Sequence, residues 1–302
     1  GRMKFTTNIN GDILDLELSS SMDNIQVMHN KNNQDIDCIA LSTNSFSVIL
    51  NGKTYYLSIM PQLDGYEVTV IDNLSNGRME NVSQEARFIK ADLAMETTYR
   101  EIAGIPFDAV FHLASQSSGA LSFEDPMADM KSHLYITFSL LQLSLKRKDS
   151  RFMFSSSTTL YGDTNGLPVN EDCPVNPKTY YATGKLACED YIRFFFGQGL
   201  STTVFRLPNV YGPGQNLQNK DQGMVSIYLS YIIEGQPILV KGSRDRFRDF
   251  IYIDDVVDGW MKGFASPDTI GKTYNLASGK KSTVNQVLEG LKRACGKPDY
   301  PV

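Results

Sequence analysis

Residues 66–72, with the sequence Tyr66-Glu67-Val68-Thr69-Val70-Ile71-Asp72, form a largely apolar run that ends on an acidic residue. β-Branched and aromatic residues of this kind favour strands. A short apolar run that leads into turn residues, here 73–77, is typical of a strand buried inside a parallel sheet. The stretch therefore predicts the beginning of a parallel α/β region.

Downstream of this stretch, strand-like runs alternate with helical patterns. The expected strands cover residues 87–90, 109–113, 152–154 and 203–207. The expected helices cover residues 134–145, where Leu and Phe recur at helical spacing, and residues 181–196. Because such alternation is the signature of βαβ units, we predict an α/β fold with a doubly wound, Rossmann-like parallel sheet.

Upstream of about residue 60 the sequence has a different texture. Over residues 14–18 leucine alternates with acidic residues, which is the period of two of a half-buried strand. Asn51-Gly52 separates the strand-like runs 46–50 and 54–59, and this pair suits a tight hairpin turn. Asn10-Gly11 is a second candidate for such a turn. This segment is therefore expected to be rich in β-structure, and it offers no chemistry.

Composition and charge exclude several classes of function. The chain has 302 residues, a net charge of -5 and a pI near 5.3, which leaves no basic surplus for the phosphates of a nucleic acid. No apolar run approaches the ~20 residues that cross a bilayer. The four cysteines and three histidines show no metal-ligand spacing, so no metal is expected. The polar start lacks a secretory signal, which favours a cytoplasmic location.

Tyr181 and Lys185 stand four residues apart in an expected helix, so their polar ends can meet on one ligand. A tyrosine, with a pKa of about 10, becomes a base at neutral pH only beside a fixed positive charge. With 15 tyrosines in the chain, this spacing also arises by chance. Ser157 adds weight, because it follows an expected strand at the edge where parallel sheets place reacting groups. Taken alone, residues 155–159 fit a simple polar turn as well as a catalytic position.

Asp72 ends the first strand of the α/β region. A carboxylate at this point accepts hydrogen bonds from the ribose diol of an adenosine. Its charge would repel a 2′-phosphate, so the position favours NAD over NADP. A turn-forming aspartate is the alternative interpretation, because residues 72–77 are rich in turn residues.

Six motifs in chain order resemble the extended short-chain dehydrogenase family of NAD-dependent nucleotide-sugar epimerases and dehydratases, most closely its UDP-glucose 4-epimerase-like branch. The motifs are residues 66–75, 111–116, 155–162, Tyr181 with Lys185, 206–214 and 248–255. The resemblance runs from about residue 64 to 302. It implies an NAD and nucleotide-sugar domain at residues 63–302, with a small C-terminal substrate-binding lobe drawn mainly from residues 163–180, 208–250 and 275–302.

The resemblance also implies roles for individual residues. The catalytic residues would be Tyr181, Lys185 and Ser157, with Lys185 lowering the pKa of Tyr181. The residues that contact NAD would be Asp72, Asn73, Asp92, Leu93, Leu113, Ala114, Gln116, Ser155, Tyr181 and Lys185. The nucleotide-diphosphate sugar would contact Ser157, Asn209 and Arg248, since a guanidinium grips phosphate oxygens in pairs. Without its flanking motif, Arg248 would be part of a solvated loop.

The reaction implied by the resemblance is epimerisation at carbon 4 through a transient 4-keto sugar. Tyr181 would take the proton of the 4-hydroxyl while hydride passes to NAD, and hydride would return to the other face. Dehydratases of the family carry an Asp-Glu pair after the serine or threonine, where this chain has Thr158 and Thr159. An epimerase is therefore expected, with a nucleotide-sugar 4,6-dehydratase as an alternative.

Two further features follow from the resemblance. The helices at 134–145 and 181–196 would meet their symmetry mates in a homodimer. His133 stands where the family usually has asparagine, and we assign it no role, because a lone histidine on a helix is usually packed or exposed.

The resemblance fails upstream of Gly65. The family begins with a strand and a glycine-rich turn whose amides hold the cofactor pyrophosphate. Spacing from Asp72 places that turn near residues 47–54, where Gly52 is the only glycine in the sequence. Residues 1–62 would thus replace the usual first βα unit. Either a strand of this segment fills the vacant place in the sheet, or the segment is a foreign piece joined near residue 60. A relative that binds nucleotide sugars but has lost NAD is the functional alternative.

Overall fold

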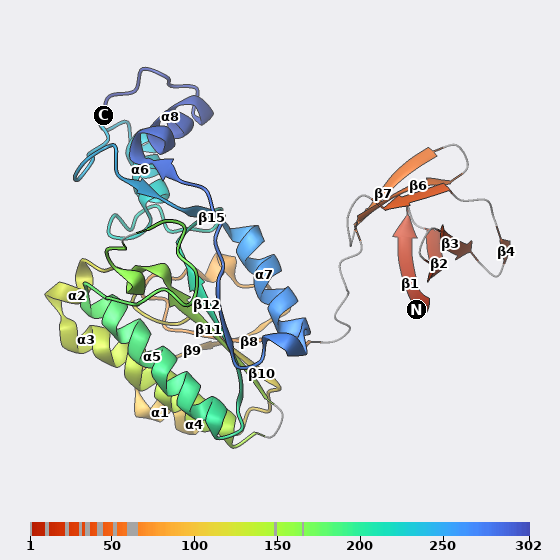
Figure 1. Ribbon diagram of the computed structural model, residues 1–302, viewed down its shortest axis with the longest axis horizontal. Helices are drawn as coiled ribbons and strands as arrows, with labels where there is room; N and C mark the ends of the chain where they lie inside the picture. The colour runs from red at the N-terminus through yellow and green to blue at the C-terminus, as the bar shows by residue number, and fades with distance from the viewer. Residues whose placement is uncertain are drawn as a thin grey trace. The chain divides into compact units, whose positions relative to one another are not determined.

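The computed structural model describes residues 66–147, 150–164 and 166–302 in full and, among residues 2–58, the backbone of seven strands. The chain divides into two compact units, residues 1–67 and 68–302. Figure 1 labels their helices and strands.

The first unit contains two antiparallel sheets. They comprise β1 (Arg2–Ile9), β2 (Asp12–Ser21), β3 (Asn24–His29) and β4 (Asn32–Asn33), and then β5 (Asp37–Ala40), β6 (Ser45–Leu50) and β7 (Lys53–Ser58). Leu50 pairs with Lys53, and Ile9 pairs with Asp12, so the strands expected beside both Asn-Gly pairs are antiparallel partners. The Asn-Gly pairs themselves lie outside the described residues. That a strand of this unit completes the sheet of the second unit stays a prediction.

The second unit is built on parallel strands (Figure 1). One sheet runs in the order β10 (Ala109–His112), β11 (Arg151–Ser157), β12 (Ser201–Leu207) and β16 (Lys272–Asn275). β8 (Thr69–Asp72) pairs in parallel with β9 (Arg87–Lys90). The predicted strands are thus present, with small shifts of their ends, and the Rossmann-like α/β sheet is confirmed.

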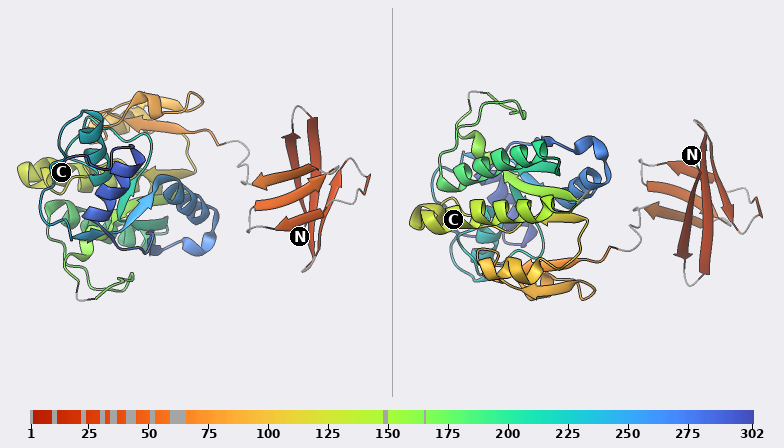
Figure 2. Two further views of the ribbon diagram at one scale, coloured as in Figure 1. Left: turned by 90° about the horizontal axis from the view of Figure 1, so that it is seen from above. Right: turned by 90° about the horizontal axis from the view of Figure 1, so that it is seen from below.

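Helices cover this sheet on both faces (Figure 2). They are α1 (Glu96–Ile102), α4 (Ile136–Leu145) and α5 (Tyr180–Gly197) on one face and α7 (Ile253–Ala265) on the other. Because successive residues of a strand face opposite sides, Phe152 and Phe154 pack beneath α4 and α5, whereas Met153 packs in the cluster that contains Trp260 of α7. β11 is therefore buried on both faces, as expected for the middle of a doubly wound sheet.

A smaller lobe has a core of its own. α6 (Met224–Ile233) and α8 (Val284–Ala294) bury Tyr228, Ile232 and Leu288 against each other, and Figure 1 shows both helices beside the C-terminus. Its short strand pairs are β13 (Asn209–Tyr211) with β15 (Phe250–Tyr252) and β14 (Phe247–Arg248) with β17 (Ser282–Thr283). This lobe corresponds to the predicted small C-terminal lobe.

Short helical segments connect the larger elements. They are η1 (Met79–Asn81), α2 (Leu121–Glu124), α3 (Pro126–Met130), the π-helical turn η2 (Lys131–Tyr135), η3 (Thr158–Tyr161) and η4 (Pro267–Thr269). Among the helices that the structure describes, none has both the length and the apolar character needed to cross a membrane.

Candidate active site

The three residues predicted to be catalytic lie together where β11 meets α5. Ser157 is the last residue of β11. α5 begins one residue before Tyr181, because the Thr179 hydroxyl caps it by accepting a hydrogen bond from the amide of Ala182 at 3.0 Å. Tyr181 makes a side-chain hydrogen bond with Ser157. The parallel sheet and the capped helix thus converge on one point at the carboxyl end of the strands.

Lys185 lies one turn further along α5. The site formed by Ser157, Tyr181 and Lys185 is called the corner. Nζ of Lys185 donates to the backbone oxygen of Ser155 at 2.7 Å and to Oγ of Ser115 at 3.0 Å. The ammonium also lies 4.8 Å from the centre of the Phe154 ring. Only 3% of the residue is exposed, so these partners compensate a buried charge. Ser115 was not among the predicted residues, because a serine after a strand carries no distinctive sequence signal.

Burial dominates the acid-base properties of this corner. It raises the pKa of Tyr181, and the hydrogen bond with the Ser157 hydroxyl lowers that pKa without reversing the shift. Lys185 was expected to lower the pKa of Tyr181, but its Nζ lies 6.0 Å from the ring centre and does not set the net direction. Burial lowers the pKa of Lys185 to about 8, so the ammonium is still mostly charged at neutral pH.

The predicted adenosine contacts lie at the end of β8. Oδ1 of Asp72 accepts from the amide of Leu74 at 2.6 Å, and Oδ1 of Asn73 accepts from the amide of Ser75 at 2.9 Å. Asp72 therefore shapes a turn, and its carboxylate retains acceptor capacity for a ribose diol, since it has about four lone-pair sites. A Cβ on Gly77 would stand 3.0 Å from Oδ2 of Asp72, so the glycine leaves room beside the carboxylate.

The remaining predicted cofactor contacts differ in how accessible they are. Asp92 is exposed, and its Oδ1 accepts from the amide of Ala94 at 2.8 Å. The side chain of Leu93 packs in the core, and its backbone oxygen accepts from the Tyr99 hydroxyl at 2.7 Å. Leu113, 62% exposed at the end of β10, and the half-buried Ala114 are open to a cofactor.

Gln116 is held by its own neighbours. Its Nε2 donates to the backbone oxygen of Ser118 and to Oδ1 of Asp129, both at 2.8 Å. Its side-chain amide is therefore committed to protein partners.

The two predicted diphosphate ligands come from two separate strand pairs, β13 with β15 and β14 with β17. Asn209 lies on β13, and its Nδ2 donates to the backbone oxygen of Asp249 at 3.1 Å. Arg248 directly precedes Asp249, is exposed, and donates only to the backbone oxygen of Phe247 among the hydrogen bonds of the described residues. The guanidinium is thus available to a ligand near the Asn209 amide.

A buried ion pair that the motifs did not single out lies behind Ser157. Arg206 on β12 binds both carboxylate oxygens of Glu189 on α5, with the Nη2–Oε2 distance at 2.7 Å and the Nε–Oε1 distance at 3.0 Å. Ser156 donates to Oε1 of the same carboxylate at 2.5 Å. The Tyr161 hydroxyl accepts from Arg206 at 2.8 Å. This network fixes the end of β11 against α5, next to the predicted catalytic residues.

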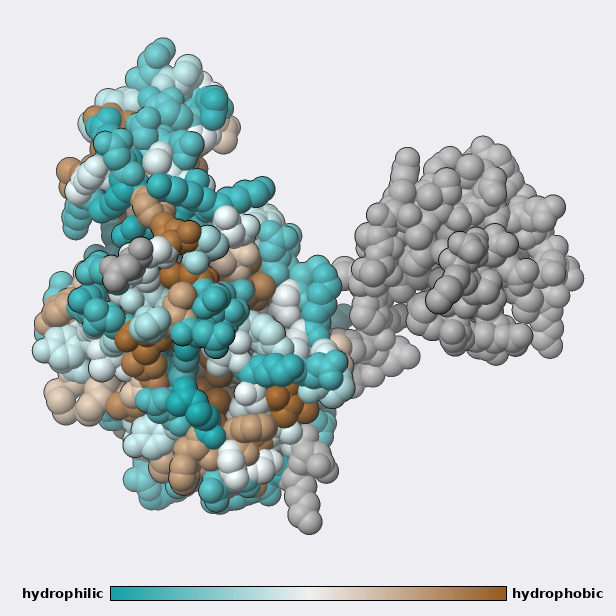
Figure 3. Space-filling model, viewed as in Figure 1, coloured by the Kyte–Doolittle hydropathy of each residue, from teal (hydrophilic) through white to brown (hydrophobic). Residues whose placement is uncertain are grey.

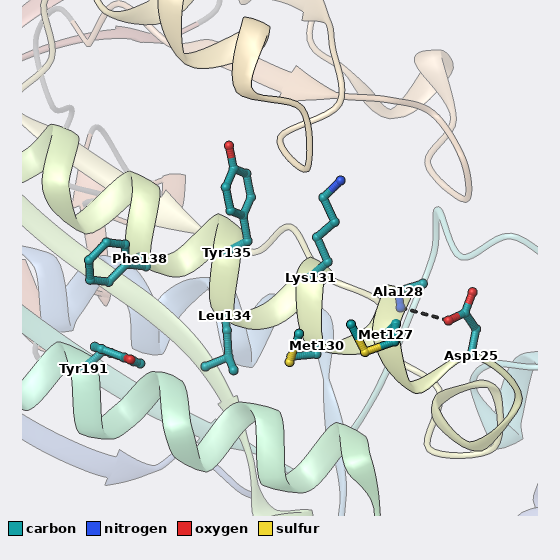
Figure 4. Close-up of a pocket in the computed structure, with 9 residues that line it drawn as sticks. All are labelled: Asp125, Met127, Ala128, Met130, Lys131, Leu134, Tyr135, Phe138 and Tyr191. Carbon is teal, nitrogen blue, oxygen red and sulfur yellow. Dashed lines mark hydrogen bonds between the residues drawn. The ribbon is translucent and has the colours of Figure 1, made fainter.

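A cavity of about 610 Å³ lies on the helical side of the unit. It is lined by Asp125, Met127, Ala128, Met130, Lys131, Leu134, Tyr135, Phe138 and Tyr191. Figure 4 shows Phe138 of α4 and Tyr191 of α5 side by side, with their ring centres 5.4 Å apart. Hydrophobic side chains also reach the surface over α5 in Figure 3, and Phe194 is 62% exposed. None of the three predicted catalytic residues lines this cavity.

Comparison with known proteins identifies the family. Residues 58–277 match the NAD dependent epimerase/dehydratase family. The chain belongs to this family. It is 30% identical over 245 residues to the UDP-glucose 4-epimerase of Mycolicibacterium smegmatis, covering 79% of this chain and 78% of that protein. It is 28% identical over 235 residues to a putative UDP-glucose 4-epimerase of Methanocaldococcus jannaschii, covering 77% and 76%.

Solved structures of family members support the same assignment. The UDP-glucose 4-epimerase of Thermotoga maritima with UDP-glucose matches with a TM-score of 0.75 and 33% identity, over 79% of this chain and 77% of that one. The Thermus thermophilus UDP-glucose 4-epimerase in complex with NAD matches with a TM-score of 0.70 and 30% identity, over 76% of each chain. The predicted family and fold are confirmed, and NAD is the cofactor of the family.

The described residues fit part of an NAD site. Asp72 at the end of β8 suits the adenosine ribose, and the exposed Leu113 suits the wall beside the cofactor. The buried ammonium of Lys185 suits the second ribose. Residues 47–54, where a pyrophosphate turn was sought, are not described beyond strand backbone. No group of acidic, histidine or cysteine side chains with metal-binding geometry occurs in the described part of the chain.

Proposed function

We propose that this protein catalyses the NAD-dependent epimerisation of a nucleotide sugar at carbon 4. The observation that supports this most is the corner where Lys185 is buried beneath Tyr181, which itself is hydrogen-bonded to Ser157. Such a corner can take a proton from a sugar hydroxyl and give it back. The proposed domain for this reaction is residues 63–302, with residues 163–180, 208–250 and 275–302 as the main parts of the substrate lobe.

Each residue of the corner has a role in the proposed reaction. Tyr181 removes the proton of the sugar 4-hydroxyl. Ser157 donates to the same sugar oxygen and favours the ionised tyrosine through its hydrogen bond. Lys185 contributes its positive charge and contacts a ribose of the cofactor. NAD, when bound, supplies a hydride acceptor for carbon 4. Asn209 and Arg248 hold the diphosphate. The resulting 4-keto sugar therefore stays bound while it rotates to present its other face to the hydride.

The cofactor contacts proposed for this reaction are Asp72, Asn73, Asp92, Leu93, Leu113, Ala114, Gln116, Ser155, Tyr181 and Lys185. Asp72 and Asp92 are acidic side chains on the adenosine side, which favours NAD over its 2′-phosphorylated form. The backbone oxygen of Ser155 also holds Lys185, so in this proposal Ser155 both contacts the cofactor and orients the lysine.

The proposal is tested by incubating the purified chain with NAD and UDP-glucose and following the sugar by proton NMR. We expect the C4 epimer to appear, and to stay absent in the variant Tyr181→Phe. If UDP-glucose is inert but another nucleotide hexose is epimerised at carbon 4, only the choice of sugar changes. If no nucleotide hexose is converted by the full chain with NAD, the proposed reaction is wrong.

A second candidate is a nucleotide-sugar-binding relative without NAD chemistry. The sequence before Gly65 favours it, because the only glycines there are Gly1, Gly11 and Gly52. This candidate predicts that calorimetry detects binding of a UDP-sugar and no binding of NAD. A 4,6-dehydratase is less favoured, because Thr159 uses its hydroxyl to hold Oγ of Ser157 at 2.9 Å and offers no carboxylate.

We further propose a homodimer formed through α4 and α5. Exposed large hydrophobic residues are clustered on these helices and the preceding α3: Met127, Met130, Phe138, Leu145, Tyr180, Tyr191, Phe194 and Phe196. Exposed apolar patches of this kind often mark protein–protein interfaces. Light scattering should give twice the chain mass, and Phe194→Glu should halve it. A wild-type chain that is monomeric at micromolar concentration would contradict the dimer. A cytoplasmic location also stays a prediction.

A further inference from the structure

Asp129 and His133 form a buried pair directly behind the proposed catalytic corner. They stand four residues apart, with Nε2 of His133 and Oδ1 of Asp129 separated by 3.3 Å. Only 2% of Asp129 and 1% of His133 are exposed. Burying a carboxylate and an imidazole without solvent is costly, so a pair of this kind needs a structural or functional reason.

The imidazole of His133 packs against the ring of Tyr181. The two ring centres are 5.3 Å apart and the planes meet at 71°, an edge-to-face contact. Gly184 makes room for it, because a Cβ at that position would stand 3.1 Å from Cδ2 of His133. Neither ring nitrogen has a hydrogen-bond partner within the described part of the chain. Packing therefore holds the His133 ring in its edge-to-face contact with the ring of the proposed base.

The backbone around His133 departs from a regular α-helix. Residues Lys131–Tyr135 form a single π-helical turn between α3 and α4. Turns of this type are rare and occur frequently at functional sites, because the extra residue redirects side chains. Here the turn contains His133, whose ring meets Tyr181, and Asp129 lies just before it.

The carboxylate of Asp129 acts on three titratable groups of α5. It faces Lys185, Tyr181 and Cys188 of α5, and it raises the pKa of each. Gln116 donates to its Oδ1 at 2.8 Å. His133 and His112 also lie within the field of Lys185, and burial lowers the pKa of both to about 3, so both rings are neutral at neutral pH.

We propose that Asp129 and His133 are positioning residues for the reaction. The imidazole fixes the ring of Tyr181 through their edge-to-face contact, and the carboxylate, 3.3 Å from Nε2 of His133, places a buried acidic group directly behind that ring. This inference rests on the proposed function, since it gives the pair a role through Tyr181 and Lys185. It concerns how the base is tuned, and it assigns neither residue a contact with the sugar.

The charge of Asp129 is tested by titrating Tyr181 without any turnover. Tyrosinate absorbance is measured against pH, and the signal of Tyr181 is the difference between each protein and the same protein carrying Tyr181→Phe. In Asp129→Asn, Tyr181 should ionise at lower pH than in the wild type. The control Glu124→Gln removes an exposed carboxylate from the neighbouring α2 and should leave the titration unchanged. Equal titrations in the wild type and Asp129→Asn would overturn the proposal.

The ring of His133 is tested by two variants. His133→Phe keeps an aromatic ring against Tyr181 and should retain kcat within a few-fold, whereas His133→Ala should lower kcat about tenfold or more with little change in KM. Equal kcat in the alanine variant and the wild type would overturn the role of the ring. If the wild type shows no turnover, the proposed function fails, and the tyrosinate titration still decides the role of Asp129.

Discussion

The corner between β11 and α5 and the strand pair β8 and β9 carry the two halves of the proposed site, and they are built in different ways. At the corner, Lys185, Ser157 and Arg206 are at most 6% exposed, and the partners of Lys185 and Arg206 lie 30 and 17 residues away in the sequence. All four residues of β8 are half-buried, and Asp72 and Asn73 bond to residues only two positions away. Changes at the corner should therefore affect chemistry and stability, and changes at β8 should affect cofactor affinity alone.

The largest expected effect is at the corner. Tyr181→Phe removes the proposed base and should lower kcat on the order of 1,000-fold, the usual range for a general acid-base group. Tyr180→Phe is a matched control, because Tyr180 is 51% exposed and its contact with Phe123 is between aromatic rings. Steady-state kinetics with a nucleotide sugar and NAD measure both. A Tyr181→Phe variant as active as the control would show that Tyr181 is not the base of the reaction.

The second effect concerns the stability of the corner. Glu189→Gln leaves the buried guanidinium of Arg206 without its counter-charge, which should lower the free energy of unfolding by about 3–5 kcal/mol. Asp190→Asn breaks the exposed pair with Arg193, whose side chain is 71% exposed, and should cost less than about 1 kcal/mol. Urea unfolding measures both variants. Similar losses in the two variants would erase the proposed difference between buried and exposed positions.

The third effect separates the β8 region from the corner. Asp72→Ser should weaken NAD binding about 10- to 100-fold, since charge-assisted hydrogen bonds to the ribose diol are lost. It should also narrow the preference for NAD over NADP, and it should leave the melting temperature almost unchanged. Calorimetry and thermal melting measure these quantities, with Glu85→Gln as a control that removes one exposed negative charge. If Asp72→Ser lowers the melting temperature and leaves the NAD affinity unchanged, the proposed difference between β8 and the corner is wrong.

The smallest effect is a pH dependence at the corner. Burial lowers the pKa of Lys185 from 10.5 to about 8, so above pH 8 the unfolded chain binds this proton while the folded chain releases it. The unfolding free energy should then rise with pH from about 8, by at most about 1.4 kcal/mol per unit. Lys185→Met should lack this rise. Cysteine thiols of the unfolded chain also ionise at about pH 8.5, but they are common to both proteins, so the difference between the two curves reports on Lys185. Parallel pH curves for the two proteins would contradict the buried charge.

Much of this picture could be predicted from the sequence. Alternating apolar runs located β9, β11 and α5 to within a few residues, because strand and helix periods are local properties. The position of Ser157 at a strand end and the four-residue spacing of Tyr181 and Lys185 followed from the same local rules. The charged side chain of Arg206, which lies within an apolar strand, gave no sign of its partner.

Other features depend on contacts between distant parts of the chain. The pairing of Arg206 with Glu189, and the packing of His133 on Tyr181, join residues from different elements. No local pattern marks such pairs, and a histidine on a helix is ordinarily packed without function. The hydrogen bond from the Gln116 amide to Asp129 is another contact between distant residues that the sequence motif does not reveal, and the cofactor contact of Gln116 stays a prediction.

The central claim is transient oxidation at carbon 4 with return of the same hydride, and a nucleotide sugar that carries deuterium at carbon 4 tests it most directly. We expect the full chain with NAD to form the C4 epimer, more slowly than with the undeuterated sugar, and the product to keep its deuterium at carbon 4. Exchange of that deuterium with solvent during epimerisation, or product formed without any dependence on NAD, would contradict transient oxidation at carbon 4.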